Sequence, residues 1–221
     1  FGGPSALYGI AAAATLASIF FMLGVHPRKI SVSREPLSLA NALAGLRYIW
    51  GQKVVFGSIT LDLFAVLLGG AVALLPVYAG EILRTGPWGL GLLRAAPGVG
   101  AAAMAMVLAN RPVRRRAGAI MLWCVAGFGA ATVVFAFSRS LLLSMAALVL
   151  VGAADMVSVV VRGTLVQTTT PDAMRGRVNS VELMFIGASN QLGQFESGLT
   201  AQWFGTVPAV ALGGIGALVV T

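Results

Sequence analysis

Long apolar stretches follow one another along almost the whole chain, and they constrain its fold more than any other feature. They lie at about residues 5–25, 54–79, 89–109, 118–137, 140–161, 179–203 and 207–221. A helix of about 20 apolar residues spans the hydrocarbon core of a bilayer, and most of these stretches reach that length. Charged residues form only 10% of the chain, against about 25% in a typical soluble domain. The sequence therefore predicts an all-α, polytopic transmembrane helical bundle.

The basic residues are unevenly divided among the connections between these stretches. Connections after the first, third and fifth stretches hold Arg28, Lys29, Arg34, Arg47, Lys53, Arg111, Arg114, Arg115, Arg116, Arg162, Arg175 and Arg177. The alternate connections hold only Arg84 and Arg139. Because basic loops stay in the cytoplasm, we expect residues 26–53, 110–117 and 162–177 to be cytoplasmic loops of a multi-pass membrane protein.

The net charge of +8 does not predict a nucleic-acid partner. The cations are divided among short loops, whereas nucleic-acid binding needs an exposed basic face. The chain has one histidine and one cysteine, Cys124, which lies inside the fourth apolar stretch. A zinc or haem site built from these residues is therefore not expected, and neither is another cofactor.

The connection at residues 26–53 contains its own apolar pattern. Leu39, Leu43, Leu46 and Trp50 recur at helical spacing, which is typical of an amphipathic helix at a membrane surface. The six stretches that follow divide as three plus three, as in secondary transporters built from inverted repeats. We therefore expect three parts: a membrane helix at 1–25, a cytoplasmic connecting loop at 26–53, and a six-helix bundle at 54–221 with its last helix truncated.

The sixth apolar stretch is the most polar of the set. It follows a charged turn, Pro171–Arg177, and carries Glu182, Ser189, Asn190, Gln191, Gln194 and Glu196. At about 100° per residue, Glu182, Ser189 and Glu196 share one helical face. Because unpaired polar groups are costly in lipid, this stripe predicts a helix that lines a transport pathway. Hydrogen bonding between packed helices is the alternative interpretation.

Two aspartates and one arginine also lie inside apolar stretches. Asp62 and Asp155 have similar expected depths, and burial favours the protonated form of a carboxyl group, so both are candidates for proton binding. Alternatively each is the structural partner of a nearby cation or of a helix terminus, and Arg162 is a candidate cation for Asp155. Arg94, in the third stretch, could pair with Glu196, attract an anionic substrate or extend to the outer membrane surface.

Two groups of mostly charged residues border the predicted cytoplasmic ends of helices. One is Arg111, Arg114 and Arg115, and the other is Asp172, Arg175, Gly176 and Arg177. Such loops can simply determine membrane topology. They can also form a cytoplasmic gate, in which arginines bind carboxylates or the carboxyl ends of helices.

These loops and helices resemble the major facilitator superfamily, and more narrowly its branch of enterobactin-exporter-like and macrolide-efflux-like bacterial proteins. The resemblance lies in Pro171–Val178, Phe185–Gly193 and Leu75–Ala79. In the loop after the third stretch, Arg111, Arg114 and Arg115 match basic positions of a superfamily motif. Asn110 stands at that motif's aspartate position and Val113 at its glycine position.

The resemblance implies the carboxy-terminal half of such a protein with the last helix of the amino-terminal half before it, in the bacterial cytoplasmic (inner) membrane. It implies a proton-coupled exporter of a siderophore or hydrophobic drug that works by alternating access and uses the proton gradient as its energy source. The missing amino-terminal half and the lipid bilayer are the expected partners. The acidic candidates for coupling are Asp62, Asp155, Glu182 and Glu196.

Two other functions are compatible with the residues. A non-transporting membrane receptor or scaffold would have a similar composition, because fold does not determine function. An intramembrane aspartyl protease would also carry two membrane-embedded aspartates, but its chemistry is associated with a Gly-x-Gly-Asp pattern. The chain instead has Gly152-Ala153-Ala154-Asp155, so the expectation is that it is not an enzyme.

Overall fold

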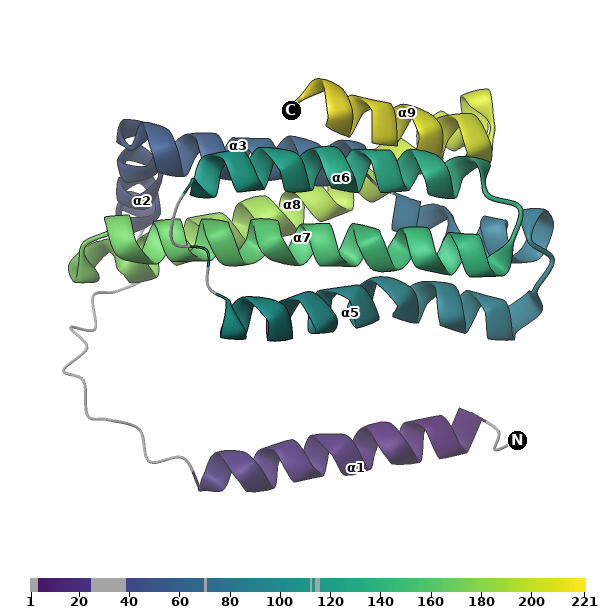
Figure 1. The fold of residues 1–221 in the computed structure, drawn as a ribbon. Helices are drawn as coiled ribbons and strands as arrows, with labels where there is room; N and C mark the ends of the chain where they lie inside the picture. Colours follow the sequence, from purple (N-terminus) through teal and green to yellow (C-terminus); the bar gives the residue numbers. More distant parts are fainter. Residues whose placement is uncertain (1–3, 25–38, 70, 112, 114–115) are drawn as a thin grey trace. The chain divides into compact units, whose positions relative to one another are not determined.

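The computed structural model describes residues 4–24, 39–69, 71–111, 113 and 116–221, and these are helical with short connections and no strand (Figure 1). The chain divides into two compact units, Phe1–Leu37 and Ser38–Thr221. The first unit contains helix α1, Pro4–Leu23, which corresponds to the predicted stretch 5–25. The first part of the predicted connection at 26–53, residues 26–38, lies outside the described residues, and so do Arg114 and Arg115 of the predicted gate.

The second unit is a bundle of long helices. Its elements are α2 (Leu39–Gly51), α3 (Lys53–Leu68), the 3₁₀ helix η1 (Ala71–Leu74), α4 (Leu75–Val77), the π-helix η2 (Tyr78–Ile82), α5 (Gly86–Asn110), α6 (Ala117–Phe137), α7 (Leu141–Thr169), α8 (Asp172–Phe204) and α9 (Thr206–Val219). Among the described residues, Lys53–Ile82, α5, α6 and α7 are long and apolar enough to cross a membrane. The prediction of an all-α bundle with membrane-spanning helices is confirmed.

The prediction that residues 162–177 form a loop is wrong. Helix α7 continues to Thr169 and α8 begins at Asp172, so only two residues connect them. Arg162 lies inside α7 and is buried. The positive charge does not end the helix because two acidic side chains from neighbouring helices bind it, as described below. The charged turn Pro171–Arg177 likewise forms the first turns of α8.

The first membrane span of the second unit is interrupted near its middle. Helix α3 ends at Leu68, and the chain continues as η1, α4 and η2 instead of one regular helix. Pro76 contributes to this interruption because proline lacks the N–H that a regular helix needs. A π-helical segment inside a span also changes the direction in which the following side chains point. The interruption places η1 beside α8, where it forms part of a cavity.

Glycines bring α5 and α7 into backbone contact. A side chain at Gly152 of α7 would collide with the carbonyl of Pro97 in α5, and one at Gly100 of α5 would collide with the carbonyl of Val149 in α7. Small residues allow membrane helices to approach this closely, and van der Waals contact then stabilises the pair. Helices α5 and α7 therefore form a closely packed pair within the bundle.

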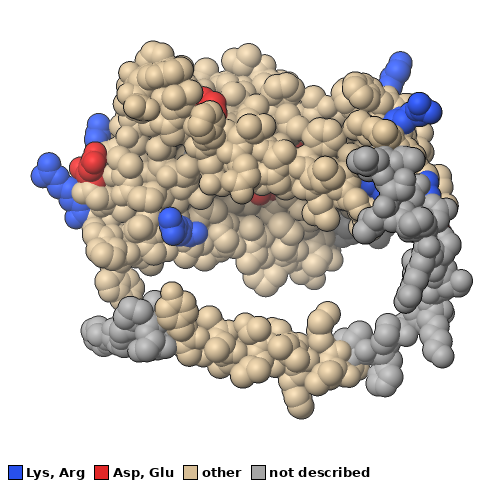
Figure 2. All heavy atoms as spheres, turned by 180° about the vertical axis from the view of Figure 1, so that it is seen from behind, with Lys and Arg blue, Asp and Glu red and all other residues tan. Residues whose placement is uncertain are grey.

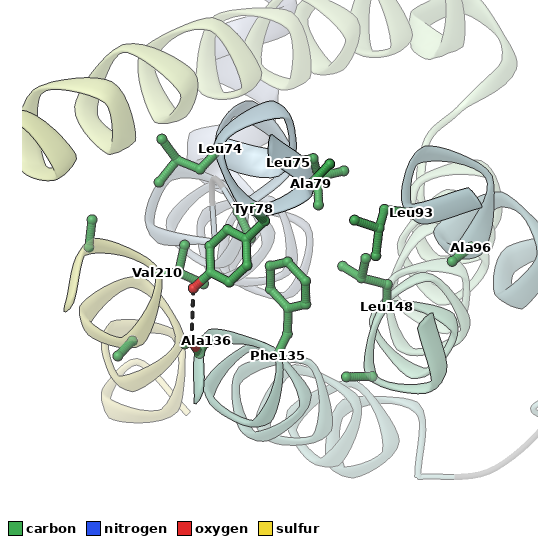
Figure 3. Close-up of a cluster of buried hydrophobic side chains, with 14 residues drawn as sticks. Leu74, Leu75, Tyr78, Ala79, Leu93, Ala96, Phe135, Ala136, Leu148 and Val210 are labelled. Carbon is green, nitrogen blue, oxygen red and sulfur yellow. Dashed lines mark hydrogen bonds between the residues drawn. The ribbon is translucent and has the colours of Figure 1, made fainter. Parts of the chain in front are cut away.

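A cluster of buried apolar side chains fills the end of the bundle near η2 (Figure 3). Tyr78 and Phe135 are fully buried there, with ring centroids 4.5 Å apart. The Tyr78 hydroxyl donates a hydrogen bond of 2.9 Å to the carbonyl oxygen of Ala136. This carbonyl lies in the last turn of α6, where an α-helix has no N–H groups left to bind its oxygens. Tyr78 therefore caps α6 from another span.

We expect Tyr78→Phe to lower the free energy of unfolding by about 1–3 kcal/mol, because it leaves a buried carbonyl without a hydrogen-bond donor. Tyr48→Phe is the matched control. The Tyr48 hydroxyl donates 2.8 Å to the carbonyl of Thr169, in the last turn of α7, but that bond is exposed and water can replace it. Thermal unfolding in detergent measures both changes, and equal losses would contradict the assigned role of Tyr78.

Candidate functional site

A buried arginine joins three helices of the second unit. Arg162 of α7 is only 3% exposed. Its Nη1 forms an ion pair with Oδ2 of Asp62 from α3, and its Nε donates 2.9 Å to Oε1 of Glu182 from α8. The hydroxyl of Ser158, one turn before Arg162 on α7, donates 3.0 Å to Oδ1 of Asp62. We call Asp62, Arg162 and Glu182 the charge cluster.

The charge cluster has more acidic than basic groups. With both carboxylates ionised, the cluster carries two negative charges and one positive charge. Asp155 lies about two turns before Arg162 on α7 and shares with Asp62 and Ser158 the lining of a small cavity of about 10 Å³, close to the minimum for one water molecule. A buried surplus negative charge is costly unless other polar groups or water stabilise it.

The second feature is an open cavity of about 780 Å³ between η1, α5 and α8. It is lined by Val72, Ala73, Leu74, Arg94, Gln191, Gln194, Phe195 and Gly198. Its size falls within the range of about 300–1,000 Å³ that is typical of small-molecule sites. The interrupted span supplies one wall, which agrees with the use of discontinuous helices at transporter binding sites. We call this the polar cavity.

The polar residues of α8 divide between two surroundings. Glu182 lies in the charge cluster, whereas Ser189 is buried and donates 2.7 Å to the carbonyl of Phe185 in its own helix. A side chain at Gly193 would lie 2.9 Å from the carbonyls of Val66 and Leu67 in α3. This part of the predicted stripe therefore packs against α3.

The nearly opposite side of α8 carries the residues that reach the polar cavity, Gln191 and Gln194. Asn190 is exposed and donates 2.9 Å to the carbonyl of Ile186 in its own helix. Glu196 is half-buried and accepts a hydrogen bond of 2.7 Å from Thr200. In the described part of the chain, no ion pair joins Glu196 to Arg94.

The residues proposed for a cytoplasmic gate lie where helices begin and end. Arg111 follows the last residue of α5 and is exposed. In the first turns of α8, Arg175 forms an exposed ion pair of 2.7 Å with Asp172, and Gly176 is exposed. A side chain at Gly45 of α2 would lie 2.9 Å from the carbonyl of Arg177, so α2 packs closely against this end of α8. The gate itself stays a prediction.

The structure thus brings together residues that the sequence placed on separate helices. Asp62 and Glu182 meet through Arg162, which the sequence associated with Asp155 or with a loop. Ser158 was missed as a partner of Asp62. Its position four residues before Arg162 puts the two on one face of α7, which is the signal that could have identified it. No metal-binding group of His, Cys, Asp and Glu occurs among the described residues.

A bundle of membrane-spanning helices, an interrupted span beside a polar cavity and a buried charge cluster define the architecture of a polytopic membrane protein. Along residues 1–221 the sequence matches the profile of the transmembrane secretion effector family. The chain belongs to this family of the major facilitator superfamily, which consists of transport proteins and not enzymes, and the predicted resemblance is confirmed.

Curated relatives of the chain are named as exporters. It is 28% identical over 219 residues to the enterobactin exporter EntS of Shigella flexneri, covering 98% of this chain and 48% of that protein. It is also 28% identical over 217 residues, with the same coverage, to the enterobactin exporters of Escherichia coli O139:H28 and O9:H4. The chain therefore spans about half the length of these relatives. No solved structure matches it significantly.

Proposed function

We propose that this chain is the carboxy-terminal half, with one preceding helix, of a proton-coupled exporter in the bacterial cytoplasmic membrane. In this proposal α1 is the last helix of the amino-terminal half and residues 26–53 form the cytoplasmic connection. The elements from α3 to α9 form the second half. The substrate passes between the two halves by alternating access, and the proton gradient supplies the energy.

The polar cavity is the observation that carries the proposal. It combines Arg94 with two amide side chains, Gln191 and Gln194, beside apolar walls. Membrane-embedded polar groups are rare and generally mark substrate or ion pathways. The relatives named as enterobactin exporters favour a siderophore as the substrate, and a hydrophobic drug is the alternative.

The charge cluster supports proton coupling. Arg162 is shared between Asp62 and Glu182, and Asp155 lies close by on the same helix as Arg162. Protonation of one carboxyl group changes how strongly the others compete for this guanidinium. Since the competing groups belong to α3, α7 and α8, a proton can bias the packing of these helices. Glu196 is the further acidic candidate for coupling.

The test is uptake of enterobactin, and separately of a fluorescent hydrophobic drug, into inverted membrane vesicles that contain the full-length protein. An exporter moves its substrate into such vesicles in exchange for protons from an acidic lumen. We expect uptake that requires the proton gradient and is abolished by a protonophore. Asp155→Asn should remove the dependence on the gradient but retain exchange of labelled for unlabelled substrate, because substrate binding does not need the proton.

Glu81→Gln is the matched control, since Glu81 is an exposed acid in η2, outside the charge cluster. Its uptake should equal that of the unchanged protein. Uptake that continues undiminished with a protonophore would reject proton coupling. Absence of flux for every compound would favour a receptor or scaffold, and cleavage of a membrane peptide sensitive to pepstatin would favour the protease.

A further inference from the structure

Arg94 is a cation at membrane depth that lacks an acidic partner among the described residues. It lies eight residues after the start of α5 at Gly86, about 12 Å along the helix. The burial of neighbouring residues in α5 determines the direction in which Arg94 points. Leu93 is fully buried in the apolar cluster and Ala96 almost fully, so α5 cannot rotate without exposing them. Arg94 is exposed and borders the polar cavity.

The position of Arg94 along the bundle also differs from the positions of many other described cations. On the face shown in Figure 2, Lys and Arg side chains gather mainly toward the two ends of the bundle, and uncharged residues cover most of the flank between them. An arginine away from the ends of a span is costly unless a counter-charge or water accompanies it. In this cavity the surrounding groups are neutral.

The side chains around Arg94 determine which kind of ligand can bind beside it. Gln191 and Gln194 are three residues apart on α8, so both reach the cavity from one helical face. Each amide offers hydrogen-bond donors and an acceptor. Phe195, Val72 and Leu74 add apolar surface. A ligand with a negatively charged planar group and an apolar or aromatic body would satisfy all of these groups.

We propose that the polar cavity is a binding site for organic anions, in which Arg94 binds the carboxylate or a comparable planar anionic group of the transported molecule. The guanidinium can form two parallel hydrogen bonds to such a group, and these charge-assisted bonds are stronger than neutral ones. Gln191 and Gln194 bind its polar substituents, and Phe195 contacts its apolar body. The inference rests on the proposed export function and narrows its substrate class.

The test compares two probes with the same pyrenyl body and different end groups, the anionic carboxylate of 1-pyrenebutyrate and the neutral hydroxyl of 1-pyrenebutanol. Their binding to the purified full-length protein in nanodiscs of neutral lipid is followed by pyrene fluorescence. We expect the protein to bind the anion at least about tenfold more tightly than the alcohol, as a charge-assisted hydrogen bond contributes. Arg94→Gln should abolish this preference and leave binding of the alcohol unchanged. Arg94→Lys should retain part of it.

Arg139→Gln is the matched control, because Arg139 is an exposed cation in the connection between α6 and α7, away from the cavity lining. It should keep the full preference for the anion. Because Arg94 is exposed, its variants should fold, and thermal unfolding checks this. If Arg94→Gln kept the preference for the anion, the inference would be overturned. Equal losses of affinity for both probes would also overturn it, because Arg94 would then only maintain the shape of the cavity.

The outcomes separate this inference from the exporter proposal. Selective binding of the anion without gradient-driven flux would support the site and reject export. Gradient-driven flux in a protein that binds both probes equally would support export and reject the anion site. If a phospholipid headgroup were the natural occupant, adding anionic lipid to the nanodiscs would displace the pyrene anion, and the assignment to a transported molecule would fail.

Discussion

Arg162→Gln is expected to lower the free energy of unfolding by about 3–5 kcal/mol, because it leaves Asp62 and Glu182 buried without a positive partner. Asp62 and Arg162 are both buried, so bulk water cannot replace the lost ion pairs. The loss should appear as a lower thermal unfolding temperature of the full-length protein in detergent. It should be accompanied by looser association of α3 and α8 with α7, since Arg162 contacts an acid from each.

Arg175→Gln is the matched control for this change. It removes an arginine that also pairs with an acid, Asp172, but both of these side chains are exposed, and exposed ion pairs contribute only about 0–1 kcal/mol. A second comparison tests charge itself. Adding Asp62→Asn and Glu182→Gln to Arg162→Gln removes the uncompensated charges and should recover part of the stability. If Arg162→Gln were no more harmful than Arg175→Gln, the charge cluster would not stabilise the bundle.

Gly152→Ala is expected to destabilise the protein by about 1–3 kcal/mol or more, because the added methyl group would collide with the backbone of Pro97. Backbone atoms cannot move aside as a flexible side chain can, so α5 and α7 would have to separate. Arg94 and Arg162 lie on these two helices. The same substitution should therefore weaken preference for the anionic probe as well as thermal stability.

Gly163→Ala separates this packing effect from the intrinsic preference of alanine for helices. Gly163 lies in the same helix, α7, but a side chain there would meet open space. Alanine is favoured over glycine in a helix by about 1 kcal/mol, so Gly163→Ala should be neutral or stabilising. Equal unfolding temperatures for the two variants would contradict the close α5–α7 contact.

The helices could be predicted from the sequence because bilayer thickness imposes a length on every apolar stretch. The stretch at 118–137 becomes α6, Ala117–Phe137, within one residue. Hydropathy does not predict the burial of a charge that is neutralised inside the bundle. Arg162 was assigned to a loop because hydropathy describes each residue alone, whereas its burial depends on acids from two other helices.

The candidate site could be predicted only in part from the sequence, for a related reason. Helical periodicity correctly groups the residues of α8 by face, but it does not reveal what each face contacts. The side with Ser189 and Gly193 packs inside the bundle, and the nearly opposite side with Gln191 and Gln194 reaches the polar cavity. The meeting of Asp62 with Glu182 depends on which helices are neighbours, and one sequence does not contain that information.

The interrupted first span has a consequence for the cooperativity of the fold. Its second part, from η1 to η2, is anchored by Leu75 and Tyr78 in the apolar cluster at one end of the bundle. Its first part, α3, is anchored by Val55 and Ile59 in a separate cluster with α2, α7 and α8. A continuous helix would transmit disorder from either cluster to the other. The interruption removes this route along the first span, whereas α7 is continuous from Leu148 in the first cluster to Val166 in the second and still joins them.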